Sequence, residues 1–142
     1  MDVLPAIFGR VLCPVEVIAE CLHRQAPPAL RAWASSSPAW LEVVDAPPWE
    51  QDDLLRLDAG EAAAIRLAHW RRATLVLMDE RKGRLVAGRL GFTVAGVLSV
   101  LAAAAKDGLL DLDSAITRLT QETNFRASDR VIAMIRSRIQ QP

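Results

Sequence analysis

Three carboxylates are the side chains whose types and positions in this sequence could support chemistry. Glu20 and Glu61 fall in segments expected to be helical, and Asp79 directly follows a short apolar run at residues 74–78. Hard divalent cations such as Mg²⁺ and Mn²⁺ take oxygen ligands, often a few carboxylates completed by water. A pair of such ions activates water and stabilises the leaving oxygen in phosphodiester hydrolysis. If the three acids converge, the sequence therefore supports metal-dependent cleavage of a phosphodiester.

The elements that would position two of these acids lie in residues 57–87. Residues 74–78 (TLVLM) are continuously apolar, which is typical of a strand covered on both faces. In an open parallel sheet, ligands bind beyond the carboxyl ends of the strands, and this is where the pattern places Asp79. Asp58 can cap the preceding helix, with Glu61 in its first turn.

Each acid also has an ordinary structural interpretation. Asp58 and Glu61 fit a variant of the capping box, in which the Glu61 carboxylate reaches back to the backbone amide of residue 58. The residue pattern alone favours this capping interpretation for Glu61. Glu20 could face solvent, and Asp79 could pair with an arginine of the segment that follows it.

Composition predicts one folded globular domain over residues 1–142, with 51% hydrophobic and 24% charged residues. The formal net charge is zero, which removes any argument for nucleic acid from overall basicity. The charge is uneven, with seven acids in residues 42–61 and six bases in residues 71–89. This distribution fits a metal site flanked by phosphate contacts, and it equally fits two solvated faces of opposite sign.

Strand and helix patterns alternate along the chain. Strands are expected at residues 10–13, 41–44, 74–78 and 93–95, with helices between them and a deeply buried helix at residues 97–106 that Gly108 ends. Alternation of this kind predicts an α/β fold in which one mostly parallel sheet carries helices on both faces, a three-layer α/β/α arrangement.

Several other kinds of site are poorly supported. No glycine loop of a standard phosphate-binding pattern occurs, the two histidines are isolated, and Cys13 and Cys21 belong to no CxxC pair. The two cysteines are expected to be buried free thiols of a reducing compartment. The first residues lack the features of a signal peptide, and the longest uncharged run, residues 90–105, is shorter than the ~20 residues of a membrane span. We therefore expect a cytoplasmic protein that does not enter a membrane.

Most of the chain resembles one known family. The run LDAGEAAAIRLA…LVLMDERKGRLVAGRLGFTVAGVLSVL is similar to prokaryotic proteins described as predicted nucleic acid-binding proteins containing a PIN domain. FGRVLCPVEVIAE resembles the second strand and helix of that family, and FRASDRVIAMI resembles its C-terminal helix.

The resemblance implies an RNase-H-like α/β/α nuclease fold with clustered acids that bind Mg²⁺ or Mn²⁺. The acids that it assigns to metal binding and catalysis are Glu20, Glu61 and Asp79, and Arg81 and Arg84 are the candidates for holding phosphate. It implies an endoribonuclease, a hydrolase of phosphodiester bonds, with single-stranded or structured RNA as substrate. Many members are toxins of toxin–antitoxin pairs, so an antitoxin protein and a second copy of the chain are the further partners to consider.

Two departures from the family support a second interpretation. The family begins with an apolar strand, central in the sheet, whose terminal Asp is a principal metal ligand. Residues 1–142 open in the segment that follows such a strand and its helix, so we expect a chain truncated at its N-terminus relative to the family. Residues 95–97 (AGV) also lack the hydroxyl groups that often flank the glycine after the last strand. The alternative function is accordingly a catalytically impaired PIN-like module that binds RNA or a partner protein.

Overall fold

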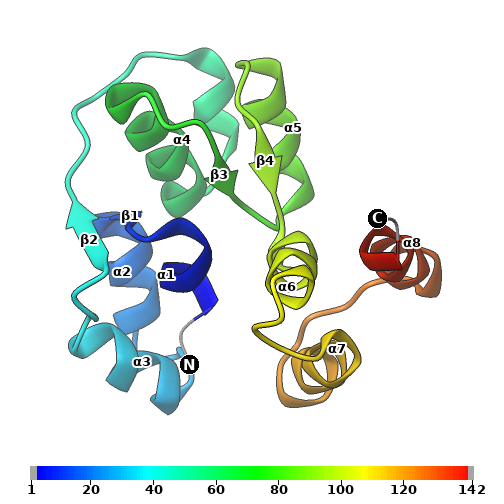
Figure 1. The fold of residues 1–142 in the computed structure, drawn as a ribbon. Coiled ribbons are helices and arrows are strands. Elements are labelled where there is room, and N and C mark those ends of the chain that lie inside the picture. The colour runs from blue at the N-terminus through cyan, green and yellow to red at the C-terminus, as the bar shows by residue number, and fades with distance from the viewer. Residues whose placement is uncertain (1–2, 141–142) are drawn as a thin grey trace. The chain divides into compact units, whose positions relative to one another are not determined.

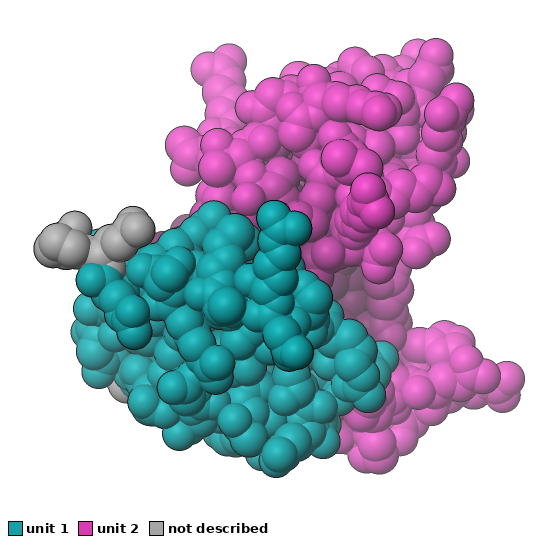
Figure 2. Space-filling model, turned by 90° about the vertical axis from the view of Figure 1, so that its right-hand side faces the viewer, with its two compact units in different colours: residues 1–7, 96–142 teal, residues 8–95 magenta. Residues whose placement is uncertain are grey.

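The computed structural model describes residues 3–140 and is rich in helix. These residues form eight α-helices, one 3-10 helix and four short strands (Figure 1). The chain divides into two compact units, coloured separately in Figure 2. One comprises residues 8–95, and the other comprises residues 1–7 and 96–142. The expectation of a single domain over residues 1–142 stays a prediction.

The unit of residues 8–95 contains all four strands and the candidate site residues. Its elements in chain order are β1 (Val11–Pro14), α2 (Val15–Leu22), α3 (Pro28–Ser35), β2 (Leu41–Val44), the 3-10 helix η1 (Asp52–Arg56), α4 (Ala59–Arg71), β3 (Val76–Leu77), α5 (Arg81–Arg89) and β4 (Val94–Ala95). The alternation of strands and helices expected from the sequence is confirmed. The strand at residues 41–44 has its predicted bounds, whereas β3 and β4 are shorter than predicted.

The strands pair in parallel, but they form two sheets within residues 3–140. In the first sheet, Val11 of β1 lies opposite Leu41 of β2, and in the second, Val76 of β3 lies opposite Val94 of β4. The prediction of one continuous sheet is wrong for these residues, because no ladder joins β1 to β3. Alternation determines that consecutive strands run parallel but does not determine which strands become neighbours. The result is a helix-rich α/β arrangement with small parallel sheets.

Strand β3 is buried on one face. Val76 and Met78 are buried, with 5% and 9% of their surfaces exposed, whereas Leu77 between them is 36% exposed. The prediction that residues 74–78 are covered on both faces is therefore wrong. Successive side chains of a strand point to opposite faces, and the face that carries Leu77 is only partly covered in this two-stranded sheet.

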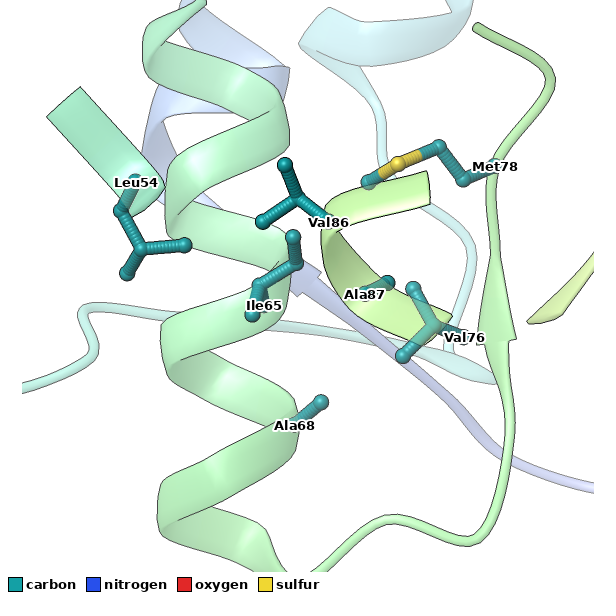
Figure 3. Close-up of a cluster of buried hydrophobic side chains, with 7 residues drawn as sticks. All are labelled: Leu54, Ile65, Ala68, Val76, Met78, Val86 and Ala87. Carbon is teal, nitrogen blue, oxygen red and sulfur yellow. The ribbon is translucent and has the colours of Figure 1, made fainter. Parts of the chain in front are cut away.

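The core of this unit joins α4, α5 and β3 (Figure 3). Ile65 and Ala87 have no exposed surface, and the side chains of Val76 and Val86 point toward them. Removal of apolar surface from water at about 25 cal/mol per Å² makes such a cluster the main source of stability for the unit. It fixes α4 and α5, the two helices around whose starts the candidate site residues lie.

The second unit is helical over its described residues. It contains α6 (Val97–Lys106), α7 (Leu112–Glu122) and α8 (Asp129–Gln140), and most of α1 (Val3–Phe8). The predicted helix at residues 97–106 is confirmed, and Gly108 follows it with φ +70°, as expected of a glycine that ends a helix. Leu98, Ile116 and Ile135 lie in the core of this unit, with 7%, 5% and 3% exposure.

Side-chain caps begin two of these helices. The backbone N–H of Ser114 donates to the Asp111 carboxylate at 2.8 Å, and that of Val131 donates to the Ser128 hydroxyl at 3.3 Å. The hydrogen bond lowers the pKa of Asp111 below its usual value. Val131 itself is 37% exposed.

Both cysteines are free, and both are half-buried, which corrects the expectation of full burial. Burial, with a smaller contribution from nearby Cys21, raises the pKa of Cys13 to about 11. Burial also raises the pKa of Cys21. Among residues 3–140, no helix combines the length and the apolar character needed to cross a bilayer.

Candidate metal and phosphate site

Asp79 lies in a cavity at the carboxyl end of β3. The cavity has a volume of about 490 Å³, and Asp79, Arg81, Arg84 and Phe92 are among the residues that line it. Arg84 Nη1 donates to the backbone carbonyl of Met78 at 3.0 Å, which holds this guanidinium against the end of the strand. The predicted position of Asp79, beyond a parallel strand and before a helix, is confirmed, and the two predicted phosphate ligands share its cavity.

The side chain of Glu20, which belongs to α2, contacts the N-terminus of α4. The backbone N–H of Gly60 donates to Glu20 Oε1 at 3.0 Å. The N-terminus of a helix carries partial positive charge and N–H groups without intrahelical partners, so a carboxylate is stabilised there. Glu20 is exposed, as its alternative interpretation allows, but it also makes this specific contact with the residue before Glu61.

Glu61 belongs to a capping box, and its two oxygens lie in different environments. The Asp58 backbone N–H donates to Glu61 Oε2 at 3.3 Å, and the Asp58 side chain accepts the backbone N–H of Glu61 in return. The capping interpretation is therefore confirmed. Glu61 Oε1 is buried and has no hydrogen-bond partner among residues 3–140, and it lies beside Gly83 in the first turn of α5. A buried oxygen without a donor is costly, which makes it a candidate ligand for a cation.

Two glycines allow these close approaches, and sequence reasoning assigned them no structural role. A Cβ at Gly60 would lie 2.7 Å from Glu20 Oε1, and a Cβ at Gly83 would lie 2.8 Å from Glu61 Oε1. Glycine within a helix costs roughly 0.5–1 kcal/mol relative to alanine, so its presence in the first turns of α4 and α5 was the available signal.

The chemistry of the donor set fits Mg²⁺ or Mn²⁺, because every candidate ligand is a carboxylate oxygen and one of these oxygens is buried without a partner. The three acids surround the starts of α4 and α5. They do not form a compact cluster, since no group of three or more His, Cys, Asp or Glu side chains within residues 3–140 could hold one metal ion. A metal-ligating role for Glu20, Glu61 and Asp79 therefore stays a prediction.

Comparison with known proteins identifies the family. A sequence profile described as a PIN domain matches residues 1–141, nearly the entire chain. Searches of curated proteins and of solved structures found no match. The match is compatible with the helix-rich α/β arrangement and its small parallel sheets. The chain belongs to the PIN domain family and is a nuclease-like module of the nucleic-acid-binding kind.

Proposed function

We propose that this protein is a metal-dependent endoribonuclease of the PIN type with a toxin-like role. In this proposal Glu20, Glu61 and Asp79 hold Mg²⁺ or Mn²⁺, and Arg81 and Arg84 hold the phosphate of the RNA. The observation that carries the proposal is the 490 Å³ cavity in which Asp79, Arg81 and Arg84 meet. It combines an acid with two cations that suit a phosphodiester, and its volume is in the range of ordinary ligand sites.

The residues of the chain have distinct tasks in this site. Guanidinium groups bind phosphate with two parallel hydrogen bonds, so Arg81 and Arg84 fix the backbone of the RNA beside Asp79. The bond from Arg84 to the Met78 carbonyl orients that guanidinium before substrate arrives, which reduces the ordering needed on binding. The metal supplies activation of water and neutralisation of charge on the phosphate.

The decisive test is cleavage of labelled single-stranded RNA by the purified chain with Mn²⁺, with Mg²⁺ and with EDTA. Cleavage should require a divalent ion. Asp79→Asn should reduce the cleavage rate by at least about tenfold, the smaller of the losses of activity typical when a residue that supports a metal site is mutated. Asp45→Asn is the matched control, since Asp45 is also exposed but does not line this cavity. Equal rates for the two variants would refute a role for Asp79.

Phosphate contact is tested at Arg81, because Arg84 also holds the Met78 carbonyl and its removal would disturb the fold. Arg81→Gln should weaken RNA binding in EDTA and reduce the slope of log K against log salt concentration by about 0.7, the value for one phosphate contact on a single strand. An unchanged slope would exclude this contact.

A second candidate function is a PIN-like module that binds RNA or a partner protein without cleaving RNA. It is favoured by the finding that the acids of residues 3–140 form no group of three that could hold one ion. In the same assays this function predicts RNA binding that is unaffected by EDTA and no metal-dependent cleavage.

The toxin-like role and its protein partner need a separate experiment. Expression of the chain alone should slow bacterial growth, and co-expression of a small protein encoded by the adjacent gene should restore it. Asp79→Asn should remove the toxicity without loss of protein. Toxicity that persists in this variant would arise from something other than cleavage at this site.

A further inference from the structure

The unit of residues 8–95 contains a second cavity, which the metal and phosphate site does not use. Its volume is about 640 Å³, and its lining includes Trp49, Arg66, His69, Trp70 and Arg72. Aromatic rings and arginines dominate this lining, and no acidic residue contributes to it. Its character is thus opposite to that of the carboxylates around the starts of α4 and α5.

Two planar side chains of this cavity are already stacked face to face. The rings of Trp49 and His69 are stacked, with 3.7 Å between their centroids and 3° between their planes. Trp49 is half-buried against the core of the unit, whereas His69 is exposed. A further planar ring can therefore extend the stack on the His69 side, in the manner of bases on aromatic side chains.

Of the two arginines that line the cavity, Arg66 is paired with Glu16 at 2.6 Å, and Arg72 suits a nucleic acid backbone. Arg72 is exposed at the end of α4, where its φ of +52° turns the chain. The adjacent Arg71 lies outside the lining, with its guanidinium carbon 5.6 Å from the centre of the exposed Trp70 ring and its Nη2 3.6 Å from Glu42 Oε1. Stacking rings beside arginines is the combination by which proteins bind single-stranded nucleic acid.

This cavity adjoins the cavity of Asp79. Phe92 lines both of them, and both lie in the unit of residues 8–95. A flexible single strand held by a phosphate beside Asp79 can therefore run along this cavity toward Phe92 and place another of its bases in the second cavity.

We propose that the cavity of Trp49, Arg66, His69, Trp70, Arg72 and Phe92 is a base-binding subsite for single-stranded RNA whose phosphate lies beside Asp79. This inference rests on the proposed function for the identity of the ligand. A base stacks on His69, and Arg72 holds the adjoining phosphate. The subsite adds affinity for unpaired RNA, because a base that is paired in a duplex is not available to enter it.

The experiment measures binding without cleavage. Fluorescence anisotropy of a labelled oligo(A) is recorded with the full chain in EDTA, for His69→Ala and Arg72→Gln. His69→Ala should weaken binding by about tenfold, within the range reported for loss of one stacked base. Arg72→Gln should weaken binding and reduce the salt slope by about 0.7. Both residues are exposed, and thermal melts verify that the variants remain folded.

The chain offers a matched control for each variant. His23 and Arg24 are also exposed and lie outside this cavity, so His23→Ala and Arg24→Gln should bind like the original chain. Equal affinity of His69→Ala and His23→Ala would overturn the subsite. A proline-rich peptide is included because aromatic grooves also bind such peptides. Binding of the peptide here, with no binding of oligo(A), would likewise overturn it.

The design separates the subsite from the nuclease proposal. If His69→Ala loses affinity and the original chain never cleaves RNA, the subsite stands and the nuclease proposal fails. If the original chain cleaves RNA with Mn²⁺ and His69→Ala binds oligo(A) normally, the nuclease proposal stands and the subsite fails.

Discussion

Replacement of Gly83 by alanine tests the packing at the start of α5. A Cβ at this position would lie 2.3 Å from Met78 Sδ and 2.8 Å from Glu61 Oε1, far closer than the 3.4–4 Å of ordinary contact. Met78 is buried, and its backbone N–H donates to the Ala95 carbonyl at 2.9 Å, so the backbone of Met78 cannot withdraw without breaking the β3–β4 ladder. Its thioether and the Glu61 carboxylate must move instead.

Two opposing effects determine the magnitude. Alanine is favoured over glycine within a helix by about 1 kcal/mol. Overpacking of a filled core costs about 1–3 kcal/mol. The clash at Gly83 therefore cancels or exceeds the helical gain, and we expect Gly83→Ala to destabilise the chain by up to ~2 kcal/mol.

Gly88→Ala is the matched control on the same helix. No atom lies within 4 Å of a Cβ at Gly88, so this variant should gain up to ~1 kcal/mol. Thermal melts of the two variants should differ by roughly 3–10 °C, since about 1 kcal/mol shifts the midpoint of a chain of this size by about 2–4 °C. Equal midpoints would refute the close packing of Gly83 against Met78 and Glu61.

Two further predictions concern an ion pair and a thiol. Arg66 Nη2 lies 2.6 Å from Glu16 Oε1, and both side chains are mostly buried. Glu16→Gln should therefore lower the free energy of unfolding, measured in urea, by about 1–3 kcal/mol. The control is Asp113→Asn, at a largely exposed pair with Arg136, which should change this free energy by less than ~1 kcal/mol. Because the Cys13 pKa is raised to about 11, the folded state binds more protons than the unfolded state at alkaline pH, and Cys13 should lose its share of stability as pH rises from about 9 through 11. Alkylation of Cys13 by iodoacetamide, followed by mass spectrometry, should accordingly accelerate across that pH range, and a rate that levels off near pH 9 would contradict the raised pKa.

The sequence alone determined most local structure. Asp58 and Glu61 predicted the capping box of α4 because both of its hydrogen bonds join residues three apart in the chain. The sequence likewise predicted the helix at residues 97–106, the glycine that ends it and the strand at residues 41–44. The spacing of apolar residues and the residue types of turns are local properties of the chain. The position of Asp79 after a parallel strand followed from the same reasoning.

Only the tertiary structure decided what lies beside these elements. That β1 and β3 belong to separate sheets depends on pairing between distant segments, which alternation of strands and helices does not encode. The contact of Glu20 with Gly60 joins residues 40 apart, and the burial of Glu61 Oε1 depends on the approach of α5. The stack of Trp49 on His69 brings a loop residue onto a helix, and no spacing in the sequence indicated it. Contacts between a side chain and the backbone of its own helix or turn depend on residues close in the chain. The residues that line a cavity depend on which distant elements pack together.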